Sequence, residues 1–214
     1  MAPPALPPVY PITPEQLRGE ALEVWARALL EGGTTLLQFR RKSGPDGEKL
    51  EDLRRLVEAA RPFGARVVVD DRVDLCLLAG AAGVHLGQRD LPPGEARILL
   101  GREAWIGFST HTLEQFEEAL DLPVDYLALG PVFPTATKEG ADPVVPPLVQ
   151  REVLRRSPLP VVAIGGVTAR KAPELWRRGF ASVAAISAFA AAPGGALAEF
   201  KAAAHEAGLP FALR

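Results

Sequence analysis

Two aspartates follow neighbouring apolar runs of the sequence, each at the point where a run ends. Asp71 ends the run RVVVDD, and Asp90 follows the run GVHLGQ. If these runs are adjacent parallel strands, the two carboxylates lie about 5 Å apart, which is one strand spacing. Carboxylates completed by water are the usual ligands of Mg²⁺ in proteins. The pair therefore predicts a magnesium site, and the structural alternative is that Asp71 pairs with Arg72 or Arg40 while Asp90 caps a helix.

Polar and cationic side chains end another apolar run, TLLQFRRK. Gln38, Arg40 and Lys42 are spaced two apart, so on a strand they share one face while Phe39 points the other way. Polar groups inside an apolar barrel are costly unless a polar partner meets them. We interpret the three residues as contacts for a polar ligand. An internal salt bridge to Asp71 or a neighbour is the alternative.

The loop segment GPVFPTATKEG has more hydroxyl and cationic side chains than a simple connection needs. It carries Thr135, Thr137 and Lys138 within four residues, behind two prolines. A solvated turn rarely needs two hydroxyls and a cation so close together, and about fifteen residues separate the segment from the next expected helix, a length typical of a lid. We predict that this loop contacts a ligand.

An anion site is predicted after the last two apolar runs. Gly165 and Gly166 follow one run, and Ile186 and Ser187 follow the next. Glycine allows backbone N–H groups to approach an anion closely, and the start of a following helix adds a favourable dipole. The position corresponds to the place where many barrels bind phosphate.

Other reactive side chains give weaker indications. His85 lies within an apolar run, where a hydrogen-bonded core role and a ligand role are equally plausible. Ser109 and His111 alternate at one strand end without a G-x-S-x-G elbow, so covalent catalysis is not predicted. Cys76 is expected in a buried helix, and no His or Cys set has zinc spacing.

Composition narrows the class of protein. The formal net charge of -2 gives no basic footprint for nucleic acid. No apolar run has the length of a membrane span. The single cysteine excludes an internal disulfide and is typical of a reducing compartment, so we expect a cytoplasmic protein that binds small molecules. Self-association into a homo-oligomer is left open.

Eight apolar runs alternate with amphipathic segments, and this pattern is typical of strand–helix units with a parallel sheet. We expect one (β/α)8 TIM barrel over residues 1–214, with residues 1–8 as a loose arm. A doubly wound sheet is the rival, but no G-x-G-x-x-G follows the first run. Barrel sites lie at the carboxyl ends of the strands, where all the candidates above fall. The expected strands are 9–13, 35–40, 66–71, 83–88, 105–110, 126–132, 160–167 and 182–189, with helices such as 17–33 and 48–64 between them.

The candidate ligand-binding residues are more than one monophosphate would require. A carboxylate pair, three cations (Arg40, Lys42 and Lys138) and a separate phosphate cradle would share one barrel mouth. This combination predicts a polyphosphate with Mg²⁺ on one side and a monophosphate on the other.

The same motifs, in the same order and spacing, resemble the thiamine phosphate synthase family. The likeness spans about residues 9–190 and rests on QFRRK, VVVDDRVDLCLLAGAAGVHLGQRDLP, IGFSTHTLEQ, DYLALGPVFPTATK, VVAIGGVT and VAAISAF. It implies a (β/α)8 barrel and a Mg²⁺-dependent transferase. This enzyme joins hydroxymethylpyrimidine pyrophosphate to thiazole phosphate and releases pyrophosphate.

The resemblance also implies roles for individual residues. Asp71 and Asp90 would hold Mg²⁺, and Ser109 would touch the substrate near the breaking bond. The implied substrate contacts are Gln38 for the pyrimidine, Arg40, Lys42 and Lys138 for the pyrophosphate, Thr135 and Thr137 for the thiazole, and Gly166, Ile186 and Ser187 for its phosphate.

One position departs from the family pattern in the site itself. Asp70 stands where the family usually has asparagine before the metal-binding aspartate, and Lys171 also stands at a family asparagine. The chain contains no asparagine at all, so a chain-wide bias explains both changes as well as lost function does. The alternatives to a synthase are the paralogous thiazole tautomerase, which needs no Mg²⁺, and a silent barrel that only binds a phosphorylated ligand. Asp71, Asp90, Pro131 and Lys138 favour the synthase.

Overall fold

The computed structural model describes residues 5–135 and 142–211. Its strands form one parallel sheet in the order β1-β8-β7-β6-β5-β4-β3-β2. A bridge between Ile12 and Gln38, with the Thr13 amide donating to the Gln38 carbonyl over 2.9 Å, closes the sheet between its two end strands. The predicted barrel is therefore confirmed. The strands are β1 Val9–Pro11, β2 Leu36–Phe39, β3 Arg66–Asp70, β4 Gly83–Leu86, β5 Trp105–Thr110, β6 Tyr126–Leu129, β7 Val161–Ile164 and β8 Ser182–Ala185.

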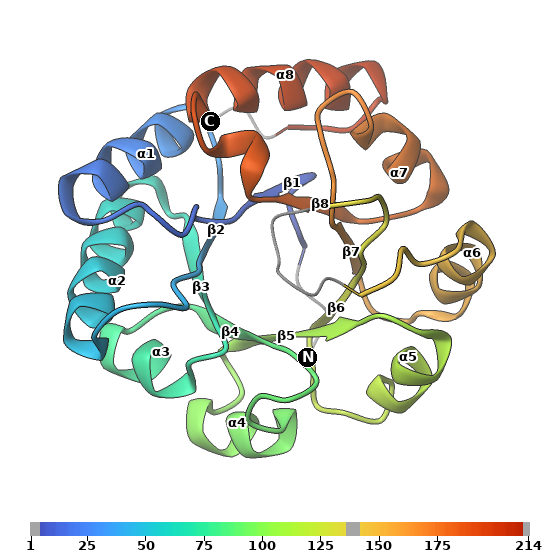
Figure 1. Cartoon of the computed structure of the whole chain (residues 1–214), viewed down its shortest axis with the longest axis horizontal. Coiled ribbons are helices and arrows are strands. Elements are labelled where there is room, and N and C mark those ends of the chain that lie inside the picture. The colour runs from blue at the N-terminus through green and yellow to red at the C-terminus, as the bar shows by residue number, and fades with distance from the viewer. Residues whose placement is uncertain (1–4, 136–141, 212–214) are drawn as a thin grey trace.

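The helices surround the sheet as an outer ring (Figure 1). Each one follows a strand, as the alternation of the sequence predicts, and Thr112 caps α5 by accepting a hydrogen bond from the Gln115 amide. The helices are α1 Gly19–Glu31, α2 Asp46–Ala60, α3 Val73–Ala79, α4 Pro93–Leu100, α5 Leu113–Ala119, α6 Pro147–Arg156, α7 Ala172–Arg178 and α8 Pro193–Glu206; short 3₁₀ helices lie at η1 Arg61–Phe63 and η2 Ser187–Phe189.

Alternation along the strands separates two apolar cores. Leu36 packs inside the barrel with residues that include Tyr10 and Tyr126. Leu37 and Phe39 pack in the larger core that contains the helix residues. Gln38 is only 3% exposed and has the parity of Leu36, so the prediction that it faces inward, away from Phe39, is confirmed.

Several strands end earlier than the sequence predicts. Strand β7 ends at Ile164 because Gly165 adopts a φ of 95°, which a strand does not continue. Strand β8 ends at Ala185, and the residues expected to extend it form η2 from Ser187 onward. The prediction of a loose arm over residues 1–8 is wrong at Pro8, whose carbonyl accepts hydrogen bonds from Val183 N and the Trp176 indole.

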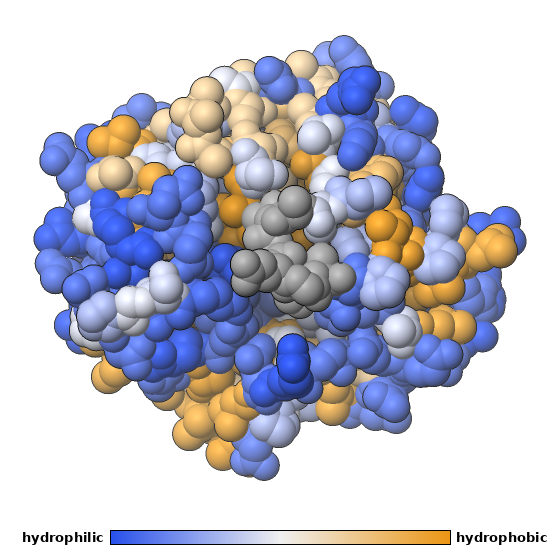
Figure 2. All heavy atoms as spheres, in the orientation of Figure 1, coloured by the Kyte–Doolittle hydropathy of each residue, from blue (hydrophilic) through white to orange (hydrophobic). Residues whose placement is uncertain are grey.

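The surface mixes polar and apolar residues. In the orientation of Figure 1, hydrophilic residues gather on the side of α2 and α3, and hydrophobic ones are visible over α4 and α6 (Figure 2). The latter include Ile98, Leu99 and Leu148, which are exposed. Over residues 5–135 and 142–211, no helix combines the length and apolar character that crossing a membrane requires.

Candidate active site

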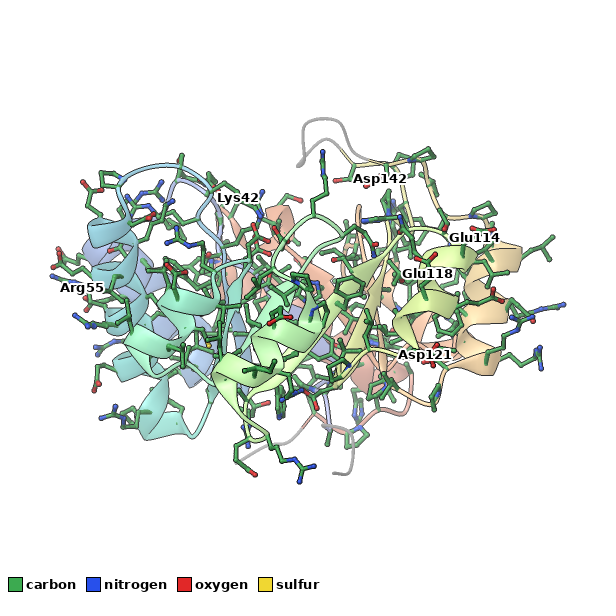
Figure 3. All side chains as sticks on the ribbon, turned by 90° about the horizontal axis from the view of Figure 1, so that it is seen from below. Lys42, Arg55, Glu114, Glu118, Asp121 and Asp142 are labelled. Carbon is green, nitrogen blue, oxygen red and sulfur yellow. The ribbon has the colours of Figure 1, made fainter. Side chains whose placement is uncertain are left out.

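A cavity of about 550 Å³ opens at the carboxyl ends of the strands. Lys42 and Asp142, both on its wall, lie at the same end of the barrel (Figure 3). Every predicted site residue within the described parts of the chain contributes to its lining, while Thr137 and Lys138 fall outside those parts. The structure thus brings these residues together around one cavity, and the role of each residue stays a prediction. The predicted residues in the lining are Gln38, Arg40, Lys42, Asp70, Asp71, Asp90, Ser109, Thr135, Gly166, Ile186 and Ser187.

Asp71 and Asp90 form an acidic pair on one wall. Asp71 has a φ of 61°, and no other non-glycine residue in the described parts has a positive φ. Its backbone amide donates to the His85 carbonyl over 2.8 Å, which fixes this turn. Burial raises the pKa of Asp90, and the neighbouring Asp71 carboxylate adds to that effect against a hydrogen bond from Gly87 N. A nearby cation would relieve this repulsion.

The structural alternatives for the acidic pair are wrong. Asp90 does not cap α4, because its Oδ2 accepts from the Gly87 amide over 2.6 Å and the helix starts after Pro92 without a side-chain cap. Arg72 pairs with Asp46 and Asp74 instead of Asp71.

The cations of the loop after β2 face these carboxylates. Lys42 forms an ion pair with Asp71, and its Nζ lies 2.7 Å from Asp70 Oδ2. Arg40 Nη1 lies 3.0 Å from Glu15 Oε2, and its Nε lies 3.8 Å from Asp70. The internal salt bridge that was the alternative for these cations is therefore present, although both cations also line the cavity.

Asp70 is the carboxylate that these cations compensate. Its Oδ2 is buried and accepts no well-directed hydrogen bond from the described residues, although Lys42 lies near it. Burial raises the pKa of Asp70 to about 6; Lys42 opposes that shift and Asp71 reinforces it. Asp70 therefore neither turns away from the cavity nor lacks a counter-ion.

Glu15 supports this wall and was missed in the sequence. It accepts hydrogen bonds from the backbone amides of Lys42 and Ser43 and pairs with Arg40. Burial alone would raise the pKa of Glu15, but the hydrogen bonds from Ser43 and Lys42 lower it overall. A lone glutamate in the loop after the first strand gives no signal of this role, because its partners lie 25 to 28 residues away.

The opposite wall has the features expected of a phosphate cradle. Gly165 and Gly166 have φ values of 95° and 64°, and Ser187 starts η2 beside them in the lining. Lys171 Nζ donates to the Gly166 carbonyl over 3.0 Å and lies 4.4 Å from the centre of the Phe133 ring. Lys171 thus ties the loop after β7 to the loop after β6.

Two histidines also line the cavity. His85 is buried and its Nε2 lies 2.9 Å from Ser109 Oγ, as the core role predicts, and it also lines the cavity, so a ligand role stays a prediction. Burial lowers the pKa of His85 to about 4, which makes its ring neutral near pH 7. His111 Nδ1 lies 2.6 Å from the Gly130 carbonyl and 3.6 Å from Asp142, a placement that the sequence did not predict.

Fold and site together define a (β/α)8-barrel protein whose cavity has an acidic pair and cations on one wall and a glycine cradle on the other. The family model described as thiamine monophosphate synthase matches residues 9–189. The chain belongs to this family.

Known relatives agree with this assignment. The chain is 36% identical to a thiamine-phosphate synthase of Caldicellulosiruptor saccharolyticus, over 84% of this chain and 81% of the relative. It is 44% identical to a thiamine-phosphate synthase of Synechococcus sp. strain WH7803, over 80% of this chain. It spans only 48% of that longer relative. A thiamine phosphate pyrophosphorylase of Pyrococcus furiosus superposes with a TM-score of 0.82 at 35% identity, covering 93% of this chain and 96% of that one.

Proposed function

We propose that this protein is a thiamine phosphate synthase. It would join hydroxymethylpyrimidine pyrophosphate to thiazole phosphate, giving thiamine phosphate and pyrophosphate. The bond between the methylene carbon of the pyrimidine substrate and the pyrophosphate oxygen breaks, and its electron pair leaves with pyrophosphate. The thiazole nitrogen uses its lone pair to form the new bond to that methylene carbon. We further propose that its partners are small molecules and that it acts in the cytoplasm.

The observation that carries this proposal is that one cavity has two walls, each with features suited to an anion. Lys42 and Arg40 lie with the acidic pair on the first wall, and Gly166 and Ser187 lie on the second. A monophosphate ligand would need only one of these walls. Two phosphorylated reactants, one of them a pyrophosphate, would use both.

The protein does not need to supply a nucleophile, because the thiazole nitrogen is already one. Its side chains would bind and orient the two substrates and stabilise the leaving group. Arg40 and Lys42 would stabilise the negative charge that grows on pyrophosphate as the bond breaks, which is the differential binding that raises a rate. Gln38 would orient the pyrimidine, and the threonines of the loop after β6, including Thr135, would orient the thiazole. Ser109 would donate a hydrogen bond near the breaking bond.

Asp71 and Asp90 fit Mg²⁺ as its protein ligands. Mg²⁺ is usually bound by one or two carboxylates, with water and substrate phosphate completing its octahedron. Among the described residues, no group of three or more His, Cys, Asp or Glu side chains is arranged to hold a metal, so the proposal rests on these two carboxylates. When bound, Mg²⁺ would neutralise charge on the pyrophosphate oxygens.

One assay tests the proposed function. Purified protein is mixed with the pyrimidine pyrophosphate, thiazole phosphate and Mg²⁺, with EDTA in a parallel sample. We expect thiamine phosphate only without the chelator. Absence of product at high enzyme concentration would refute the synthase proposal. Conversion between thiazole tautomers that survives EDTA would favour the tautomerase, and binding of thiazole phosphate without turnover would favour a silent barrel.

Replacing Gly166 by alanine is expected to weaken thiazole phosphate binding. Gly166 has a φ of 64°, and a Cβ there would lie 2.4 Å from the Pro134 carbonyl oxygen. The left-handed conformation alone costs a residue with a Cβ about 1–2 kcal/mol. We expect the KM for thiazole phosphate to rise about 10-fold in steady-state assays, with little change in the KM for the pyrimidine substrate.

The matched control for this substitution is Gly179→Ala. Gly179 has a φ of 108°, but a Cβ there would meet nothing within 4 Å. It carries backbone strain without the collision at the cradle, so both KM values should stay near those of the wild type. Equal changes in the two KM values for Gly166→Ala would contradict the assignment of this wall to thiazole phosphate.

A further inference from the structure

A continuous chain of hydrogen bonds runs beneath the cavity from Gln38 on β2 to Ser109 on β5. Gln38 Nε2 donates to the Tyr10 hydroxyl over 3.2 Å, and the hydroxyls of Tyr10 and Tyr126 lie 3.2 Å apart. The Tyr126 hydroxyl lies 3.1 Å from His85 Nδ1, and His85 Nε2 lies 2.9 Å from Ser109 Oγ. The chain thus joins the predicted pyrimidine contact to the serine predicted near the breaking bond.

The two tyrosines belong to the floor and not to the lining of the cavity. Tyr10 is 1% exposed and Tyr126 is fully buried, whereas Gln38, His85 and Ser109 line the cavity. The tyrosine rings meet edge to face at 6.3 Å between centroids. Both hydroxyls stay protonated, because burial raises the pKa of each tyrosine well above its usual range.

Gly107 makes the middle of this chain sterically feasible. A Cβ at this position of β5 would lie 2.1 Å from Tyr126 Cζ and 2.4 Å from His85 Nδ1. Such distances are far inside van der Waals contact, so any larger residue would displace the hydroxyl or the imidazole. The strand thus leaves room for the contact between Tyr126 and His85.

Counting hydrogens gives the chain a direction. Each hydroxyl has one hydrogen to donate. Because Tyr10 accepts from Gln38, its own hydrogen goes to Tyr126, and the hydrogen of Tyr126 goes to His85 Nδ1. The neutral imidazole then carries its hydrogen on Nε2 and donates it to Ser109, whose own hydrogen is left for the cavity.

The opposite direction is disfavoured. If Ser109 donated to His85 and the imidazole donated to Tyr126, Tyr10 would accept from both Gln38 and Tyr126. Its own hydrogen would then be buried without an acceptor, which is costly. Only turning the Gln38 amide around, so that its oxygen accepts from Tyr10, would satisfy that direction.

We propose that Tyr10 and Tyr126 are positioning residues that couple the amide orientation of Gln38 to the donor role of Ser109. This rests on the proposed function. With the observed amide orientation, Gln38 Oε1 is left to accept from a donor on the pyrimidine. Ser109 at the same time offers its hydrogen to the charge that develops on the leaving pyrophosphate. The same chain of hydrogen bonds would thus contact the pyrimidine substrate at its ring, through Gln38, and at its leaving group, through Ser109.

The tautomer of His85 reports the direction of the chain without any substrate. The protein has three histidines, so ¹⁵N-histidine NMR gives three imidazole patterns, and His85→Gln identifies the one that belongs to His85. In the wild type near pH 7 we expect hydrogen on Nε2 and a bare Nδ1. In Tyr126→Phe, which keeps the ring and removes the hydroxyl, we expect a mixture of tautomers.

Turnover gives the second measurement. For Tyr126→Phe we expect kcat to fall about 10-fold, the lower end of the loss seen when a hydrogen-bond partner that orients a metal-ligating side chain is removed. The KM for thiazole phosphate should not change, because the glycine cradle is untouched. Thr110→Val is the matched control. It removes a buried hydroxyl of the neighbouring strand β5, which donates to the Ala128 carbonyl over 3.1 Å, and should leave kcat and the His85 pattern unchanged.

The proposal and the proposed function can fail separately. Hydrogen on Nδ1 of His85 in the wild type, or an Nε2 pattern unchanged in Tyr126→Phe, would overturn the positioning role whatever the enzyme assay shows. If Tyr126→Phe does not fold, Tyr10→Phe removes the partner of the Gln38 amide, while the Tyr126 hydrogen keeps His85 Nδ1 as its acceptor. We then expect the Nε2 pattern to persist and the KM for the pyrimidine substrate to rise, and a mixture of tautomers or an unchanged KM would overturn the proposal. A fixed Nε2 tautomer in a protein that forms no thiamine phosphate would defeat the proposed function alone.

Discussion

Asp71→Asn is expected to lower turnover by about 100-fold or more while leaving the fold intact. A bound metal ion contributes several kcal/mol of charge stabilisation in reactions of this kind, and each 1.36 kcal/mol corresponds to a factor of ten in rate. Asparagine keeps the size of the side chain but removes the charge that would hold Mg²⁺. The measurement is kcat over a Mg²⁺ titration, in which the half-saturating Mg²⁺ concentration should also rise.

The backbone of Asp71 makes this test selective. Its φ of 61° is a left-handed conformation that asparagine tolerates at least as well as aspartate. The free energy of unfolding in EDTA should therefore be unchanged or higher in the variant.

Asp74→Asn is the matched control for Asp71→Asn. Asp74 lies three residues further on, at the start of α3, and its carboxylate pairs with Arg72 outside the cavity. Its substitution removes the same charge and should leave kcat and the Mg²⁺ titration near wild type. Full activity of Asp71→Asn at ordinary Mg²⁺ concentration would remove Asp71 from the metal site.

Asp70→Asn is expected to stabilise the protein at pH 8 but not at pH 3.5. Burial raises the pKa of Asp70 from 3.8 to about 6 in the folded state. Between these values the folded protein binds more protons than the unfolded chain, so stability falls as the pH rises through this window. Above it the ionised carboxylate keeps lowering the free energy of unfolding, and its removal should raise that free energy by about 1–3 kcal/mol. Urea unfolding in EDTA measures the difference.

Turnover of Asp70→Asn should be unchanged or higher. Lys42 lies 2.7 Å from Asp70, so the substitution leaves this lysine freer to meet pyrophosphate. Asp121→Asn is the control, since Asp121 is exposed at the opposite end of the barrel from Lys42 (Figure 3). It should give no pH-dependent gain. An equal gain of Asp70→Asn at both pH values would contradict the burial argument, and a loss of turnover would show that the carboxylate serves the reaction.

Local pattern was enough to predict the barrel. Runs such as RVVVDD contain buried β-branched residues followed by charged ones, which indicates both a strand and the rim at which it ends. The positions of strand ends were less predictable. The run SVAAISAF is apolar throughout, yet Ile186 adopts φ and ψ of -106° and -66° and turns the chain out of the sheet. Nothing in its residue types marks that change.

The site was predictable where its residues lie at strand ends, because parallel strands bring these ends together. The supporting contacts were not. Tyr10 and Tyr126 are 116 residues apart and meet across the barrel interior, where both read simply as aromatic core positions. The role of Glu15 likewise depends on how the first loop folds against the second, which no spacing encodes.

The seam of the barrel has a thermodynamic consequence. Gln38 accepts the Thr13 amide that joins β1 to β2, and its side chain points to where the pyrimidine is expected. A ligand bound by Gln38 would bind the closed barrel more tightly than a barrel in which β1 and β2 have separated at this seam. By linkage, ligand binding would then stabilise the whole fold, and each opening of the seam would dismantle the binding site along with the sheet.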